Sequence, residues 1–397
     1  MQLTTEEQDM LAGGQGRTTQ KAMQILEALG RIYGAERMIS ISSVQVSGVS
    51  YDNLGKAGLQ FLAELADGGG TVRVPTTLNP AGMDIENWQS LGIPPDFAKK
   101  QCEVLDAFSR MGVTMTCTCT PYLVGNLPTS GEHLAWSESS AVCYANSVLG
   151  ARTNREGGPS ALAAALTGRT PQYGLHLAEQ RIPKITFQLQ APLNGTRDFG
   201  ALGKVIGEKI SVSKTIPYII GVPSATLEEL KSLCASLATF GGAALFHMHG
   251  ITPEADQVRV PDDLITISQA EIAAAIQSLN IAEETEVDFV SLGCPHLSLP
   301  EIAHLASLLE GQQVRKEFWI TTARQTKLMA DSLGYTRLIE AAGAKFAADT
   351  CCVVAPIQGR FTALATDSAK ACYYASAKNK FKTRMLPFDE VVRLALR

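Results

Sequence analysis

The sequence predicts an α/β protein built on largely parallel sheets. Short apolar or β-branched runs alternate with longer helical patterns along most of the chain, which is the order of elements in repeated βαβ units. The chain has 397 residues, of which 45% are hydrophobic, so it can bury either one large core or the cores of two to three domains. No internal repeat or low-complexity tract interrupts this alternation.

Seven short segments are predicted strands, because each is apolar or β-branched and is bounded by turn-forming residues. They are Thr71–Pro75, Val113–Cys119, Ile185–Leu189, Ala243–Met248, Val287–Leu292, Phe318–Thr322 and Lys345–Ala348.

Longer segments with a helical spacing of apolar residues are predicted helices. They include Thr19–Tyr33, Ala57–Ala66, Ser139–Leu149, Ala225–Thr239, Pro300–Leu309 and Gln325–Glu340. Ser298 and Glu301 have the spacing of a capping box, with Pro300 in the first turn and Gly311 after the helix. Gly150 is predicted to close the helix at Ser139–Leu149 in the same way.

Domain boundaries are weakly marked, since the chain has no long charged linker. The polar stretches Asn194–Asp198 and Asn280–Glu286 are the best candidates for internal breaks in a body that spans residues 1–397.

Composition excludes several classes of protein. The formal net charge is 34 − 39 = −5 and there is no basic tract, which argues against non-specific nucleic-acid binding. No apolar run approaches the roughly 20 residues of a membrane span. The acidic amino terminus has no basic region followed by an apolar stretch, so a secretory signal is not expected. We therefore expect a cytoplasmic globular protein that binds neither membranes nor nucleic acids.

Nine cysteines are present, and a cytoplasmic chain rarely uses them in structural disulfides. Four of them lie in helical apolar patterns and are predicted to fill the core: Cys102, Cys143, Cys234 and Cys372. The other five are Cys117, Cys119, Cys294, Cys351 and Cys352, and each of their three sites follows a strand-like run and precedes a turn or a helix.

The ends of these strands predict where the cysteines gather. In an open parallel sheet, ligands bind at the carboxyl ends of the strands. Cys294 also precedes the capped helix at Ser298, whose N-terminus would favour a thiolate. A site shared by cysteines near positions 119, 294 and 351 would have to be assembled by the fold, because 175 and 57 residues separate them.

Three converging thiolates have few uses. A structural zinc site needs four ligands, usually in local C-x₂₋₄-C pairs, and the chain has no such pair. Dispersed single cysteines fit an iron–sulfur cluster with three thiolate ligands and one open iron better. That iron would be a Lewis acid able to activate a hydroxyl group. Three unrelated buried cysteines remain an equal alternative on spacing alone.

Two glycine- or proline-containing loops have the character of ligand-binding segments. Gly48-Val49-Ser50 offers free backbone N–H groups to an anion. Asn79-Pro80 follows a strand end and presents amide and carbonyl groups from a fixed turn. Ordinary turns would have the same composition, so both interpretations stay open.

A third polar segment, Ser137–Ser140, opens a predicted helix, where hydroxyl and N–H groups form a seat for a carboxylate or phosphate. Glu138 within it could exchange a proton, provided that burial raises its pKa. Arg152 and Arg155 suit bidentate anion recognition, although a solvated loop would look the same.

Other chemistry-bearing residues give weaker indications. His247 and His249 alternate along a strand and so would point to the same face, and we favour two hydrogen-bonded pocket histidines over metal ligands. Lys370 looks like a surface lysine by composition. The glycine fingerprint of dinucleotide-binding folds and the P-loop are both missing from the sequence, which argues against a dehydrogenase or NTPase.

The segment from Cys117 to His176, with the motifs SLGCPH and ADTCCVVAPI, resembles the large subunit of the aconitase X family. The similarity runs from VSGVSYDNLG to the carboxyl end. The resemblance implies an aconitase-like large body of mostly parallel sheets with flanking helices. It also implies an iron–sulfur hydro-lyase that acts on a small hydroxy-carboxylate.

The family motifs assign roles residue by residue. The implied cluster ligands are Cys119, Cys294 and Cys351, most simply around a [4Fe-4S] cluster with one open iron. The implied substrate contacts are Gly48, Val49, Ser50, Asn79, Pro80, Glu138, Ser139 and Lys370, with Glu138 and Ser139 also catalytic.

The resemblance implies two further features. Single-chain members carry a smaller swivelling domain for which this chain is too short, so we expect a separate small subunit that supplies a serine base. The expected reaction is dehydration of (R)-5-phosphomevalonate to trans-anhydromevalonate 5-phosphate in an archaeal-type mevalonate pathway, with cis-3-hydroxy-L-proline dehydration as the alternative. An iron-sensing or RNA-binding aconitase-like protein and a zinc hydrolase are the alternatives of other classes.

Overall fold

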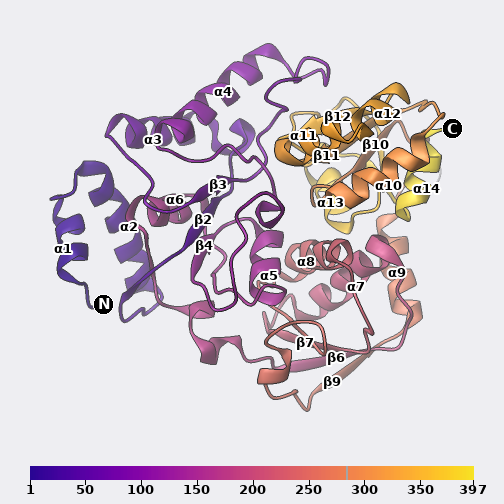
Figure 1. Ribbon diagram of the computed structural model, residues 1–397. Helices are drawn as coiled ribbons and strands as arrows, with labels where there is room; N and C mark the ends of the chain where they lie inside the picture. The colour runs from indigo at the N-terminus through magenta and orange to yellow at the C-terminus, as the bar shows by residue number, and fades with distance from the viewer. Residues whose placement is uncertain (283–284) are drawn as a thin grey trace.

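Three parallel sheets with flanking helices make up the computed structural model, which describes residues 1–282 and 285–397 (Figure 1). The predicted α/β class with mostly parallel sheets is therefore confirmed. The only antiparallel pairing between named strands in the described ranges joins β1 (Met38–Ser40) to β5 (Arg169–Pro171).

The first sheet has the strand order β3-β2-β4, with every pair parallel. Its strands are β2 (Ser43–Val46), β3 (Thr76–Leu78) and β4 (Leu134–Trp136). The helices of this part are α1 (Thr5–Ala12), α2 (Arg17–Ile32), α3 (Tyr51–Asp67), α4 (Pro95–Arg110), α5 (Ser139–Ser147) and α6 (Gly158–Thr167). Every residue of β2, β3 and β4 is buried, so the sheet forms the centre of this part.

The second sheet has the order β8-β7-β6-β9 and is also parallel. Its strands are β6 (Ile185–Leu189), β7 (Pro217–Ile220), β8 (His247–Met248) and β9 (Leu264–Ile267), and its helices are α7 (Gly195–Ile210), α8 (Leu227–Gly241) and α9 (Gln269–Leu279). Helices α7 and α8 approach closely at Gly203 and Gly207, where an added Cβ would lie 2.8 Å from backbone atoms of α8. Helix α5 packs on α8 and so joins this core to the first part (Figure 1).

The third sheet has the order β12-β11-β10-β13-β14, again parallel throughout. Its strands are β10 (Phe289–Leu292), β11 (Glu317–Thr322), β12 (Lys345–Ala348), β13 (Ala363–Thr366) and β14 (Lys382–Met385). Its helices are α10 (Leu299–Leu309), α11 (Arg324–Ser332), α12 (Tyr335–Ala341), α13 (Ala369–Tyr374) and α14 (Phe388–Ala395). In Figure 1 this part, in orange and yellow, lies beside α4 of the first part and above α7 and α8 of the second.

Two predicted strands are confirmed to the residue, at Ile185–Leu189 and Lys345–Ala348. Those at 287–292 and 318–322 are confirmed within two residues as β10 and β11. The prediction at 243–248 shrinks to His247–Met248, because the N–H of Phe246 donates to the Ser147 hydroxyl and not to a neighbouring strand.

The predicted strands at 71–75 and 113–119 are wrong. The N–H groups of Val72 and Arg73 donate to carbonyls at the ends of helices α4 and α6, so the strand begins only at Thr76. In the second segment an isolated bridge joins Thr114 to Thr77, and beyond it the Thr116 hydroxyl accepts from Leu78 N and donates to Leu78 O, both at 3.1 Å.

Helix predictions agree with the structure apart from their ends and one break. The Ser298–Glu301 capping box is present, and Gly311 follows α10 with a φ of +69°. The single helix predicted over 325–340 is two helices, α11 and α12, because Gly334 adopts a φ of +81° that a right-handed helix cannot contain. Gly150 also has a positive φ, although α5 ends three residues earlier.

Of the two stretches proposed as internal breaks, one lies at the start of a helix and the other lies between two elements. Asn194–Asp198 coincide with the start of α7. The stretch Asn280–Glu286 lies between α9 and β10, and its residues 283 and 284 are outside the described residues. Across the described ranges, no helix is long and apolar enough to cross a membrane.

Candidate active site

A cavity of about 250 Å³ lies where loops of the first and third parts meet. Most of the residues singled out in the sequence line it: Gly48, Asn79, Pro80, Cys119, Glu138, Ser139, Cys294, Cys351 and Lys370. Of the first six, Cys119 lies between α4 and β4 and the others follow β2, β3 and β4, while the last three follow β10, β12 and β13. The carboxyl ends of parallel strands from two sheets thus face one space.

One cysteine of each close pair reaches this cavity. Cys119 and Cys351 line it together with Cys294, whereas Cys117 and Cys352 are buried in hydrophobic clusters. The three lining thiols are close enough for their charges to interact, because a charge on Cys351 raises the pKa of both Cys119 and Cys294. The fold therefore brings together three sulfurs that are far apart in the sequence.

These thiols are poor thiolates in the protein alone. Burial, followed by the charge of Glu138, raises the pKa of Cys119 to about 12. Burial also raises the pKa of Cys294, which outweighs the expected effect of the helix that begins five residues later. Thiolates in such surroundings need a cationic partner, and a metal centre deprotonates its thiol ligands.

The donor set therefore fits an iron–sulfur cluster. In the described ranges, no group of three His, Cys, Asp or Glu side chains converges on a point where one metal ion would sit. An iron–sulfur cluster has separate iron atoms that each take one thiolate, so three thiols that line one cavity of about 250 Å³ suit it.

Glu138 and Lys370 form a buried ion pair at the cavity wall, with 2.5 Å between Glu138 Oε1 and Lys370 Nζ. Glu138 Oε2 accepts from the Ser140 hydroxyl and from Ala141 N–H, both at 2.6 Å. Burial alone would raise the pKa of Glu138, but the Lys370 ammonium and these donors hold it below its ordinary value. Proton exchange by Glu138 is expected only if burial raises its pKa. The pKa is lowered instead, so the carboxyl group is ionised at neutral pH and cannot donate a proton.

The same ion pair shifts the pKa of Lys370 in the opposite direction. Burial would lower its pKa, yet the Glu138 charge and the nearby thiols Cys294 and Cys119 raise it above the ordinary lysine value. The surface position suggested by its composition is wrong, because only 12% of the side chain is exposed.

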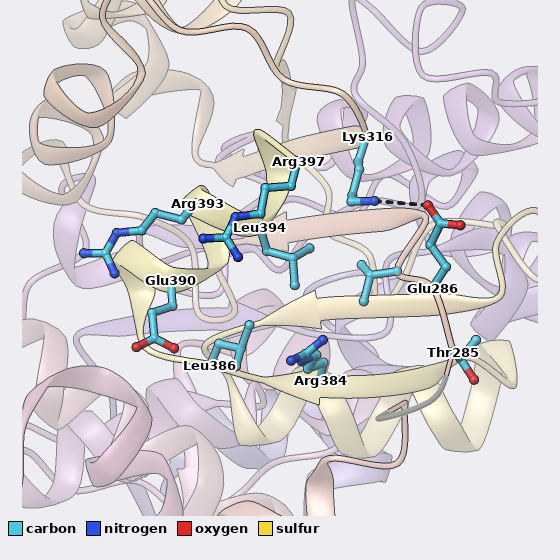
Figure 2. Close-up of a pocket in the computed structure, with 10 residues that line it drawn as sticks. Thr285, Glu286, Lys316, Arg384, Leu386, Glu390, Arg393, Leu394 and Arg397 are labelled. Atoms are coloured by element: carbon cyan, nitrogen blue, oxygen red, sulfur yellow. Dashed lines mark ion pairs between the residues drawn. The ribbon is translucent and has the colours of Figure 1, made fainter.

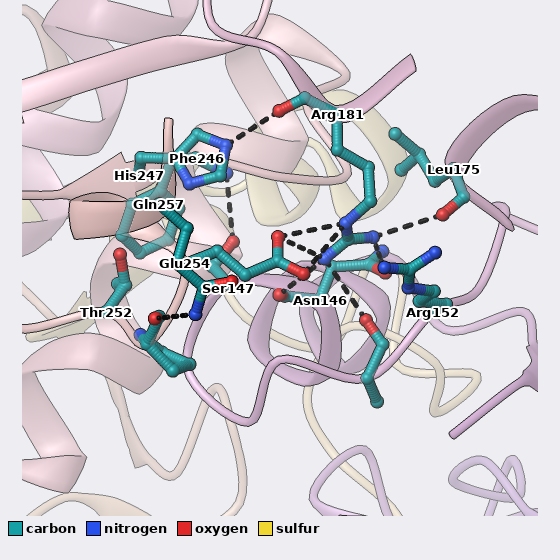
Figure 3. A network of polar contacts seen from close by, with 12 residues as sticks. Asn146, Ser147, Arg152, Leu175, Arg181, Phe246, His247, Thr252, Glu254 and Gln257 are labelled. Atoms are coloured by element: carbon teal, nitrogen blue, oxygen red, sulfur yellow. Dashed lines mark hydrogen bonds and ion pairs between the residues drawn. The ribbon is translucent and has the colours of Figure 1, made fainter. Parts of the chain in front are cut away.

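Helix α5 presents Glu138 as its N-cap and Ser139 as its first residue. No hydrogen bond is made by the Ser139 hydroxyl within the described chain, and the side chain lines the cavity. The opposite end of α5 is fixed by the network in Figure 3. There the guanidinium of Arg181 donates to Asn146 and pairs with Glu254 at 2.9 Å. The second part of the chain thus anchors the helix whose first turn faces the cavity.

The loop after β2 contributes backbone to the cavity. Gly48 lines it with a φ of +79°, and a Cβ added there would meet no atom within 4 Å. Val49 and Ser50 are buried outside the lining, and the Ser50 hydroxyl donates to the Val354 carbonyl at 3.3 Å. Any contact of these two residues with a ligand would therefore come from the backbone.

Asn79 carries a buried side-chain oxygen, Oδ1, with no hydrogen-bond partner in the described ranges. A buried acceptor without a donor is unfavourable unless a ligand supplies one. Since Asn79 lines the cavity, this oxygen is available to a substrate hydroxyl or to a donor that enters with it.

Cationic side chains lie at the mouth of the cavity. Arg155 is exposed and lines it, with no carboxylate partner among the described residues. Lys378 also lines it, 3.6 Å from Asp52, and donates to the carbonyls of Val353 and Val354. Glu138 neutralises the charge of Lys370. The charge of Arg155 therefore makes the cavity net positive.

Three of the other candidates lie elsewhere. Arg152 donates to the His176 carbonyl at 3.4 Å. His247 is buried and bonds to the Arg181 carbonyl (Figure 3), while His249 contacts the Tyr218 hydroxyl. Both histidines are hydrogen-bonded, as expected, but the shared pocket is not found, because His247 is buried whereas 65% of the His249 side chain is exposed.

Sequence reasoning missed His296, which lies two residues after Cys294. Its ring is fully buried and contacts Thr118 and Thr350, each the residue before a cavity cysteine. Burial lowers the pKa of this histidine to about 4. The motif SLGCPH contains the residue, but nothing in its spacing indicates a contact with positions 118 and 350.

A second missed residue, Arg324, joins the segment after β3 to the cysteine loop after β12. It pairs with Asp84 at 2.6 Å and with Asp349 at 2.5 Å, and both carboxylates are almost fully buried. These ion pairs fix Asp349, two residues before Cys351, against the first part of the chain.

A larger cavity, of about 630 Å³, lies in the third part (Figure 2). Its cationic residues are Lys316, Arg384, Arg393 and Arg397. No cysteine is among its lining residues, so size alone does not locate the chemistry in this chain.

Comparison with known proteins gives matches along the whole chain. Family models for the first, second and third domains of aconitase X match residues 1–179, 183–277 and 287–397. The crystal structure of Thermococcus kodakaraensis aconitase X in its holo-form is similar with a TM-score of 0.93 and 42% identity, and the match covers 100% of both chains.

Curated relatives fall into two groups. The phosphomevalonate dehydratase large subunit of Methanothermobacter thermautotrophicus is 47% identical over 94% of this chain and 93% of its own length. The protein of that name from Methanocaldococcus jannaschii is 46% identical over 99% of this chain and 100% of its own length. The cis-3-hydroxy-L-proline dehydratase of Pseudomonas aeruginosa is 35% identical over 93% of this chain but only 65% of its own length.

Proposed function

Because the chain belongs to the aconitase X family, we propose that it is the large subunit of a dehydratase that converts (R)-5-phosphomevalonate to trans-anhydromevalonate 5-phosphate. Relatives named for phosphomevalonate are more similar to it than those named for cis-3-hydroxy-L-proline. The observation that carries the proposal is one cavity lined by three thiols, a buried lysine–glutamate pair and a cationic rim.

Cys119, Cys294 and Cys351 would hold the iron–sulfur cluster, proposed as [4Fe-4S] with one open iron. When bound, such a cluster supplies a Lewis acid that makes the departing hydroxyl a better leaving group. Lys370 lies near enough to Cys119 and Cys294 for the charges of those thiols to raise its pKa. Its ammonium group therefore stabilises negative charge at this end of the cavity.

The carboxylate end of the substrate is proposed to bind between Lys370 and the first turn of α5. The Ser139 hydroxyl and the helix N-terminus donate hydrogen bonds, and charge that grows on the carboxylate during α-proton removal is stabilised by donors already in place. Glu138 holds the ammonium of Lys370 at the wall, so the two residues act as one positioning unit.

The phosphate end is proposed to lie at the rim, near Arg155 and Lys378. Arg155 is the cation without a carboxylate partner in the described ranges, and a guanidinium matches a phosphate in a bidentate manner. The open space above Gly48 leaves its backbone accessible to the same group.

The base that removes the α-proton is proposed to come from a separate small subunit. Glu138 is ionised but already bonded to Lys370, Ser140 and Ala141, so it has little capacity to accept a further proton. Relatives named as large subunits support a two-chain enzyme.

The decisive experiment reconstitutes the chain anaerobically with iron, sulfide and the small subunit of the same organism. Dehydration of (R)-5-phosphomevalonate and of cis-3-hydroxy-L-proline is then measured side by side. We expect turnover of the first substrate, and loss of that turnover in Cys294→Ala. Cys102→Ala is the matched control, because Cys102 is exposed on α4; the prediction that it fills the core is wrong. Turnover of hydroxyproline alone, or of neither substrate, would overturn the proposal.

A further inference from the structure

One buried imidazole contacts all three loops that carry the cavity cysteines. His296 Nδ1 lies 2.9 Å from the hydroxyl of Thr118, the neighbour of Cys119. His296 Nε2 lies 3.0 Å from the carbonyl of Thr350, the neighbour of Cys351. The residue itself follows Cys294 by two positions. No other side chain in the described ranges forms hydrogen bonds to two of these loops while belonging to the third.

The partners determine the tautomer of the ring. The Thr350 carbonyl can only accept, so Nε2 carries the hydrogen and donates it. Nδ1 then accepts from the Thr118 hydroxyl. The hydroxyl of Thr118 in turn accepts from the backbone N–H of Thr120 at 3.1 Å, which places bonds on both sides of Cys119.

The backbone of His296 adds a direct contact with a thiol. Its N–H donates to Cys119 Sγ at 3.3 Å. Its carbonyl accepts from Lys231 Nζ at 2.9 Å, and this buried lysine pairs with Glu301 at 2.6 Å. Glu301 also closes the capping box of α10, so the histidine is anchored to a helix on the side away from the cavity.

We propose that His296 is a positioning residue that sets the spacing of Cys119, Cys294 and Cys351 before any cluster binds. The two ring nitrogens hold the segment between α4 and β4 and the loop after β12 at fixed places relative to the loop after β10. A rigid ring with polar atoms on opposite sides does this without water, in a site where unpaired polar groups are strongly unfavourable. This inference rests on the proposed function, because the ligand set is the one proposed there.

Two substitutions separate the two contacts. An asparagine amide reaches the place of Nδ1, and a glutamine amide reaches the place of Nε2. His296→Asn should keep the contact with Thr118 and lose the one with Thr350, and His296→Gln should do the reverse. His176→Asn is the matched control, because His176 is equally buried but lies in the pair with His133, away from the cavity.

The measurement is iodoacetamide alkylation of each cysteine in the full chain without cluster, followed by mass spectrometry. In His296→Asn we expect alkylation of Cys351 to rise about tenfold with little change at Cys119, and in His296→Gln the opposite pattern. Cys143, Cys234 and Cys372 serve as internal references, because all three are buried elsewhere in the core.

Two results would overturn the inference. One is an equal rise at all buried cysteines, which would mean that the substitutions loosen the whole fold. The other is no change at any of them, or the pattern seen in His176→Asn. Failure of the proposed function would give a different result. The wild-type chain would then bind no iron and sulfide on reconstitution, and the alkylation patterns of the two His296 variants would still decide the role of this residue.

Discussion

Lys370 Nζ and Glu138 Oε1 lie 2.5 Å apart although 232 residues separate them in the sequence. Glu138 caps a helix of the first part, and Lys370 lies in α13 of the third. Both side chains are largely buried, with 5% and 12% of their surface exposed. The pair therefore ties the two walls of the cavity together and fixes the charge of each member.

Breaking this pair should destabilise the protein in a pH-dependent way. Lys370→Met leaves the Glu138 carboxylate buried and unpaired, which costs about 3–5 kcal/mol of unfolding free energy near pH 7. The pKa of Glu138 lies below 4.5 in the folded wild type, so its contribution is present above pH 4.5 and is lost as the pH falls through the folded pKa. In the variant burial would instead raise that pKa, so stability should fall as the pH rises above 4.5.

Urea unfolding of wild type and Lys370→Met between pH 4 and pH 8 measures this difference. The gap between the two proteins should widen from pH 4 to pH 7. Lys209→Met is the control, because Lys209 and Glu271 form a partly exposed pair that contributes at most about 1 kcal/mol. A gap that does not change with pH would contradict the role assigned to the Glu138 charge.

Cysteine substitutions should separate the members of each close pair. We expect Cys119→Ala and Cys351→Ala to lose bound iron and sulfide on reconstitution, because their thiols line the cavity. Cys117→Ala and Cys352→Ala should keep both, because these thiols are buried in hydrophobic clusters. Iron and sulfide analysis with the visible spectrum of the anaerobic protein measures the outcome, and cluster loss in Cys352→Ala with retention in Cys351→Ala would reverse the proposed assignment.

Local patterns predicted those parts of the fold that depend on neighbouring residues. Ile185–Leu189 and Lys345–Ala348 are largely buried parallel strands, and most of their residues are apolar or β-branched. The capping box at Ser298 likewise uses residues three positions apart. The segment 113–119 failed because a threonine hydroxyl takes over the ladder bonds at Leu78, an exchange that no propensity describes.

The candidate site could be predicted only in pieces. Strand ends marked Cys119, Cys294 and Cys351 as unusual, but spacing did not distinguish Cys119 from Cys117, and the family resemblance supplied that choice. Lys370 looked like a surface residue, because its partner Glu138 lies on another part of the chain. The polar contacts of this site join segments that approach one another only after three sheets have formed.

Substrate phosphate should be recognised by Arg155. Arg155→Gln removes a charged hydrogen-bond donor worth about 1.5–3 kcal/mol, so KM for (R)-5-phosphomevalonate should rise about ten- to hundredfold while kcat changes little. Activity on unphosphorylated (R)-mevalonate, measured at saturating concentration, should be unaffected. Arg259→Gln is the control, because Arg259 is an exposed arginine paired with Asp262 away from the cavity. Equal losses on both substrates would place Arg155 at the carboxylate end instead.

Helix α5 should depend on the guanidinium that fixes its far end. Arg181 donates to the side-chain and backbone oxygens of Asn146 and to the Ala151 carbonyl, and it pairs with Glu254 (Figure 3). Arg181→Met leaves Glu254 without its cation and the carbonyls of Asn146 and Ala151 without this donor, and it should lower the unfolding free energy by about 3–5 kcal/mol. Arg181→Lys should recover only part of this, because an ammonium cannot reproduce the planar set of donors. Since α5 carries Glu138 and Ser139 at its other end, we also expect kcat to fall in Arg181→Lys at a temperature where circular dichroism shows the variant to be folded. Full activity in that folded variant would show that the first turn of α5 keeps its place without the anchor.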